Sequence, residues 1–138
     1  MTTSLTTAAN ATARAGGAFG LRLSSGKRCS LRRRTLPGLQ TYYVLALRTE
    51  DCSPGDVGEL QSLAHRIGRM LARRHYGDPE CYSLLYNAAR TRRRPWPHVH
   101  ILLARSVADK RRGMLVFQLK HLLRWRRWPL VRQLVELG

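Results

Sequence analysis

The stretch "RPWPHVHILLA", Arg94 to Ala104, contains a predicted β-strand over residues 96–104, "WPHVHILLA". Side chains alternate along a strand, so His98 and His100 share one face, while Val99 and Ile101 point to the other and suit a buried layer. The two imidazoles then project side by side, with Cα atoms roughly 6.6 Å apart. That spacing suits one shared metal ion, or one ring assisting chemistry at the other. The plainer interpretation is two half-buried, hydrogen-bonded histidines.

Two further segments have the composition of strands, and a helix is predicted between them. Residues 41–48, "TYYVLALR", and 80–87, "ECYSLLYN", are rich in aromatic and branched side chains. Ser53 has the chemistry of a helix N-cap, and Asp56 stands at capping-box spacing from it. Gly77 is a suitable stop signal. The helix is therefore expected to run from the N-cap to this glycine.

A second helix is predicted after the histidine strand, over residues 113–128, "GMLVFQLKHLLRWRRW". Ser106 and Asp109, just before it, again have capping-box spacing, and Pro129 interrupts it. The predicted order is strand, helix, hairpin of two strands, helix. This order predicts an α+β domain over residues 41–138, an antiparallel sheet with helices packed on it.

Residues 1–40 differ in composition and are predicted to form a flexible basic arm. The first twenty are mainly Thr, Ala and Gly, and no acidic residue precedes Glu50. Three consecutive arginines, Arg32, Arg33 and Arg34, are expected to contact phosphates. The same composition is also similar to an organelle transit peptide, which leaves import into an organelle as an alternative.

The charge of the chain predicts a polyanionic partner. Among 138 residues, 25 Lys and Arg outnumber 8 Asp and Glu, giving a formal net charge of +17. Nucleic acid is the first expectation and an anionic membrane surface the second. Three scattered cysteines suit a reducing, cytoplasmic compartment. No apolar run approaches the roughly 18 residues that a membrane span needs. We therefore expect no membrane-spanning segment and take nucleic acid, rather than a membrane, as the partner.

The turn before the histidines, "ARTRRRPWP" at 89–97, has the composition of a nucleic-acid contact. It carries four arginines and a tryptophan, Arg90, Arg92, Arg93, Arg94 and Trp96. Arginine pairs with phosphates and tryptophan stacks on unpaired bases. A basic turn beside two histidines predicts a groove for single-stranded nucleic acid.

The same stretch resembles the motif of the HUH endonucleases: His, a hydrophobic residue, His, then an apolar run, often with a preceding Pro. This family includes rolling-circle replication initiators, relaxases and small single-strand transposases, and the resemblance covers about residues 41–104. It implies that His98 and His100 bind Mg²⁺ or Mn²⁺ and that a tyrosine attacks the polarised phosphate, becoming linked to the DNA.

Two departures from that family bear on the expected chemistry. Its tyrosine follows the motif on a helix, whereas all five tyrosines here precede the motif. Tyr86 is the stand-in nucleophile, because it lies near the end of the strand expected to pair with the histidine strand. The family also adds a third metal ligand, for which Glu80, Asn87 and His121 are the candidates here.

A second resemblance is to the histidine triad nucleotide hydrolases and transferases. "HVHIL" matches two of the three histidines of their signature, and Asn87 stands eleven residues before the first. The resemblance implies that His100 is the nucleophile and His98 its helper. Leu102 stands where the third histidine would be.

These observations predict, first, a single-stranded DNA-binding protein with metal-dependent nicking activity, similar to a replication initiator or transposase. The enzymatic alternative is a nucleotide phosphate hydrolase or transferase that uses His100. The third interpretation is a basic nucleic-acid-binding module without catalysis, in which the histidines are structural.

Overall fold

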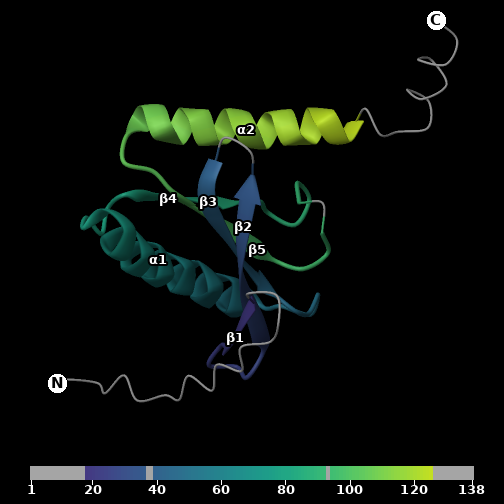
Figure 1. The fold of residues 1–138 in the computed structure, drawn as a ribbon. Helices are drawn as coiled ribbons and strands as arrows, with labels where there is room; N and C mark the ends of the chain where they lie inside the picture. The colour runs from purple at the N-terminus through teal and green to yellow at the C-terminus, as the bar shows by residue number, and fades with distance from the viewer. Residues whose placement is uncertain (1–17, 37–38, 93, 126–138) are drawn as a thin grey trace, which may run out of the picture.

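The structure, a computed structural model, describes residues 18–36, 39–92 and 94–125, with the side chains of 36, 39–41 and 120–125 left aside. It consists of one antiparallel sheet with two helices packed on it (Figure 1). The elements are β1 (Ala18–Arg22), β2 (Arg28–Leu36), β3 (Leu39–Leu47), α1 (Pro54–Tyr76), β4 (Tyr82–Tyr86), β5 (His98–Leu103) and α2 (Val107–Trp125). The predicted α+β class is confirmed.

The five strands lie in the order β1-β2-β3-β5-β4, and every neighbouring pair is antiparallel. The histidine strand β5 is therefore an inner strand. His100 is paired with Val44 of β3 on one side and with Leu85 of β4 on the other. This places both imidazoles on a backbone held by hydrogen bonds along both of its edges.

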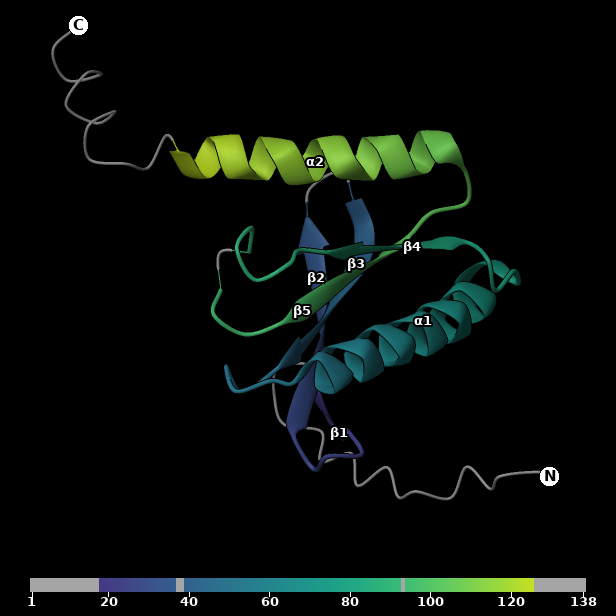
Figure 2. The ribbon, with the colours of Figure 1, turned by 180° about the vertical axis from the view of Figure 1, so that it is seen from behind.

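Helix α1 covers one face of the sheet (Figure 2). The alternate residues of β3 and β5 that point to α1 are apolar and meet an apolar stripe of the helix. The central members of this core are Leu45, Leu47, Val99, Ile101, Leu60, Ala64 and Ile67, all buried. Each large side chain of this kind contributes about 1.5–3 kcal/mol of transfer free energy, so this layer sets the register of the inner strands.

The ends of α1 are where the capping residues predicted them. The Ser53 side chain accepts a hydrogen bond from the Asp56 amide, and the Asp56 carboxylate accepts one from the Ser53 amide. Gly77 ends the helix in the left-handed conformation, with φ 75°, and its amide donates to Arg73 O. Local chemistry therefore determines both boundaries.

The turn between β1 and β2 is tied to the first turns of α1. Lys27 Nζ lies 2.6 Å from an Asp56 carboxylate oxygen. Ser24 donates through its amide and its hydroxyl to the Glu59 carboxylate, at 2.7 and 2.6 Å. These contacts join the N-terminal hairpin to the rest of the sheet and helix.

The prediction that residues 1–40 form a flexible arm is wrong for residues 18–36, which form β1 and β2. The physical reason is the alternation within β2. Cys29 and Leu31 point to the α1 side and are buried, while Arg32 and Arg34 remain exposed. A strand with one charged face is compatible with a sheet that has one solvated side. Residues 1–17 lie outside the described part of the chain.

Helix α2 begins at Val107, six residues before the predicted start, and the Asp109 amide donates to Ser106 Oγ at its N-terminus. It lies across one end of the sheet, on the side away from α1 (Figures 1 and 2). Its Phe117 ring packs edge-on against Tyr42, with centroids 4.7 Å apart. The predicted end at residue 128 and Pro129 fall outside the described residues. No helix in the described ranges is long and apolar enough to cross a membrane.

Candidate nucleic-acid interface

The sheet face that points away from α1, termed the arginine face, is assembled by strand register. Paired residues of neighbouring strands point to the same side, so alternate residues of all five strands combine there. Its members are Ala18, Gly20, Arg22, Arg28, Ser30, Arg32, Arg34, Tyr42, Val44, Ala46, Ser83, Leu85, His98, His100 and Leu102.

The arginine face is strongly basic. Arg22, Arg28, Arg32 and Arg34 on it are all exposed, and Arg48, which directly follows β3, is exposed as well. None of the five described strands contains an acidic residue. The exposed acidic residues Glu50 and Asp51 follow Arg48 in the next loop, outside the strands. Within the strands the positive charge is unopposed, and such charge attracts and concentrates polyanions.

The two histidines lie next to each other on this face but in different surroundings. Their ring centroids are 5.2 Å apart in an edge-to-face arrangement. His98 is half-buried, with Nδ1 3.3 Å from Trp96 O. His100 lies beneath α2, with its ring 5.5 Å from that of Phe117, and its Nδ1 atom is buried. Both histidines are half-buried, and His100 is the one whose ring contacts α2.

The donor set of this pair does not fit Mg²⁺ or Mn²⁺. Hard divalent cations prefer several oxygen ligands, and two imidazole nitrogens are too few. Within the described residues, no group of three or more His, Cys, Asp and Glu could hold a metal ion. Glu80, a candidate third ligand, lies in the loop between α1 and β4, with a carboxylate oxygen 3.4 Å from Arg69. The His121 side chain lies outside the described residues.

The structure does not bring Tyr86, the stand-in nucleophile, to the histidines. β4 does pair with β5, but Tyr86 is opposite Val99 and points to the α1 side, whereas Leu85 is opposite His100. All five tyrosines lie in described strands or helices, and Tyr42 alone shares the arginine face. Tyr42 is only 3% exposed beneath α2. The α2 residue that packs against the rings of Tyr42 and His100 is Phe117, which has no hydroxyl.

The turn between β4 and β5 is ordered by its own hydrogen bonds. The Thr91 and Arg92 amides donate to Ala88 O at 3.0 and 3.1 Å. The Arg92 guanidinium donates to Pro95 O at 2.8 Å. Because these bonds already order the turn, less conformational entropy is lost when the turn binds a ligand.

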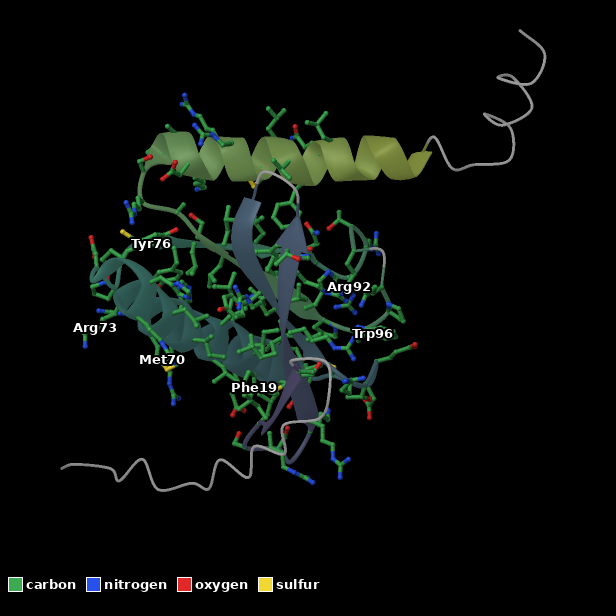
Figure 3. The ribbon with its side chains drawn as sticks, viewed as in Figure 1. Phe19, Met70, Arg73, Tyr76, Arg92 and Trp96 are labelled. Atoms are coloured by element: carbon green, nitrogen blue, oxygen red, sulfur yellow. The ribbon has the colours of Figure 1, made fainter. Side chains whose placement is uncertain are left out.

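Trp96 and Arg92 lie on the side of the sheet away from Met70 and Arg73 of α1 (Figure 3). The Arg94 guanidinium carbon lies 5.9 Å from the centroid of the Trp96 ring, within the range of a cation–π contact. The predicted grouping of Arg94 and Trp96 is therefore present. Arg90 is exposed in the same turn, and Arg93 lies outside the described residues.

The three arginines of the predicted arm are divided between the two faces of β2. Arg32 and Arg34 belong to the arginine face, whereas Arg33 is paired with Tyr43 and points to the α1 side. Arg22, Arg28 and Arg48 were not predicted as site residues. The alternation of polar and apolar residues in "RCSLR", 28–32, was the signal that could have identified Arg28.

Comparison of the chain with protein families, curated proteins and solved structures finds no match. The basis for assigning a function is therefore the geometry and charge of the arginine face.

Proposed function

We propose that this chain binds single-stranded nucleic acid, with DNA as the first expectation, through the arginine face and the adjoining turn at 87–97. The observation that supports this most is the combination of five exposed arginines with Trp96 around one sheet surface whose strands carry no acidic residue. Guanidinium groups contact successive phosphates, and an aromatic ring accepts an unpaired base.

A single strand fits this surface better than a duplex. The bases of a duplex are stacked and paired, so Trp96 can stack only on a base that is already unpaired. Phosphate contacts from arginine do not depend on sequence, so binding is expected to be sequence-tolerant and strongly salt-dependent.

The proposal is binding without cleavage. The described residues supply two imidazoles without a third ligand, and Tyr86 points away from them. The alternative chemistry at His100 is disfavoured because Phe117 packs on that ring and Leu102, where a third histidine would stand, is buried. His98 then contributes as a hydrogen-bonding contact on the binding surface.

The experiment is a fluorescence-anisotropy titration of labelled oligothymidylate, its RNA counterpart and a duplex over a range of salt concentrations. Arg28→Ala/Arg32→Ala tests the arginine face, and Arg66→Ala/Arg73→Ala on the exposed side of α1 is the matched control, with the same loss of charge. The slope of log K against log salt is negative, and each lost phosphate contact should reduce its magnitude by about 0.7. Equal losses for both pairs, or no salt-sensitive binding by the unsubstituted protein, would refute the proposal.

A further inference from the structure

We propose that the bound strand crosses the β-strands along one row of residues and stacks a base on Trp96 at the end of that row. The row, termed the arginine line, consists of Arg22, Arg28, Arg48 and Trp96. This inference rests on the proposed function and specifies the path and the contact that selects an unpaired base.

The backbone places these four residues side by side across the sheet. Arg22 and Arg28 are Cα partners in the β1–β2 pair. The Arg48 amide donates to Arg28 O at 3.0 Å, which continues the β2–β3 ladder by one residue. The Leu47 amide donates to Pro97 O at 3.0 Å and so brings the neighbouring Trp96 to the end of the row. Strands lie about 4.8 Å apart, so the line spans roughly 14 Å.

The alternative path, along β5, meets an obstruction. At the far end of the arginine face Tyr42 and Leu102 are buried, and the Phe117 ring of α2 lies 4.7 Å from that of Tyr42. Figure 1 shows α2 lying across this end of the sheet. The arginine line is at the opposite end, where Arg22, Arg28 and Arg48 are exposed. A polyanion is therefore guided across the strands and away from α2.

Trp96, at the end of the arginine line, is held in position by neighbouring arginines. Arg94 lies over its ring at 5.9 Å, and the Arg92 guanidinium holds the preceding residue through Pro95 O at 2.8 Å. Trp96 is partly exposed, so we infer that a base can stack on the indole while its phosphate remains within the field of Arg48 and Arg94. Only an unpaired base can take this position, so Trp96 accounts for selection of single strands.

The test compares substitutions within the same sheet face. For oligothymidylate binding, Arg28→Ala/Arg48→Ala should reduce the magnitude of the slope of log K against log salt by about 1.4, or about 0.7 per contact. Arg32→Ala/Arg34→Ala, nearer to α2, should lower it by less than half as much. Trp96→Leu should weaken binding about 5- to 100-fold with an unchanged slope, because stacking involves no release of counterions.

A strand of equal length made only of abasic sugar phosphates isolates the stacking contact. The unsubstituted protein and Trp96→Leu should bind that strand equally, and Trp96→Phe should recover most of the affinity for oligothymidylate. Circular dichroism melting establishes that each variant is folded. An equal loss for Trp96→Leu on both strands, or equal slopes for the two arginine pairs, would overturn this inference while leaving the proposed function in place. Failure of the unsubstituted protein to bind any single strand would overturn both.

Discussion

Replacing Gly68 by alanine should destabilise the protein, although alanine is the better helix former. A Cβ atom at Gly68 of α1 would lie 2.5 and 2.8 Å from two ring carbons of Tyr82 on β4. The ring is held in place, since the Tyr82 hydroxyl is 2.9 Å from His65 Nδ1. Relieving the overlap requires the helix to move away from the strand.

Two opposing terms determine the size of this effect. Gly→Ala inside a helix contributes about 0.8–1.0 kcal/mol of stability, whereas an overpacked methyl group costs about 1–3 kcal/mol. The second term dominates because the overlap involves a ring whose hydroxyl is hydrogen-bonded. We expect the free energy of unfolding of Gly68→Ala to fall by up to about 2 kcal/mol.

Gly58 in the same helix provides the matched control, because a Cβ atom there would have no neighbour within 4 Å. Gly58→Ala should therefore raise the free energy of unfolding by up to about 1 kcal/mol. Urea unfolding followed by circular dichroism measures both variants. In a Tyr82→Ala background, Gly68→Ala should become stabilising. If Gly68→Ala stabilised the otherwise unsubstituted protein as much as Gly58→Ala does, the close packing of α1 on β4 would be refuted.

Three other predictions concern the carboxylate at the start of α1, the buried thiol and the histidine pair. The Lys27 ammonium group, with the Ser25 and Ser53 hydrogen bonds, holds the pKa of Asp56 well below its usual range. The resulting stability is present above the unfolded pKa of about 3.9 and lost as pH falls below it. In urea melts, the free energy of unfolding should therefore fall less between neutral and acid pH for Asp56→Asn than for the unsubstituted protein. Burial raises the pKa of the Cys29 thiol to about 11. A thiol reagent at mildly alkaline pH should therefore label Cys29 only as the protein unfolds. Peptide mapping that finds Cys29 labelled in the native state would contradict its burial. Labelled single strands should remain intact with Mn²⁺ or EDTA, and cleavage that is abolished by His98→Ala/His100→Ala would instead establish metal-dependent nicking.

Several elements could be predicted because their determinants are local. The capping box at Ser53 and Asp56 and the glycine at 77 act within a few residues of the helix ends that they define. Strand alternation correctly separated Val99 and Ile101 from the histidines, since the period of a strand is a property of its backbone. The α+β class follows from the order of these elements.

The N-terminal hairpin and the position of Tyr86 could not be predicted in the same way. Residues 18–36 carry five arginines, one lysine and no acidic residue, and this charge outweighed the short alternation at 28–32. Their stability depends on pairing with β3 and on contacts such as Lys27 to Asp56. The prediction that β4 pairs with β5 was correct, but the register was not predicted, and it places Tyr86 opposite Val99 on the face away from the histidines.

The sequence by itself therefore determined both ends of α1, the strand character of β3, β4 and β5, the positive charge and the adjacency of the two histidines, since each depends on neighbours along the chain. Only the tertiary structure decided which arginines share a surface. Arg22, Arg28 and Arg48 lie on three successive segments and meet because hydrogen bonds set the register between those segments. Likewise, the contact between the His100 and Phe117 rings depends on the packing of α2 across one end of the sheet. Pairing between distant segments is a property of the folded chain, and it places the basic groups together in space.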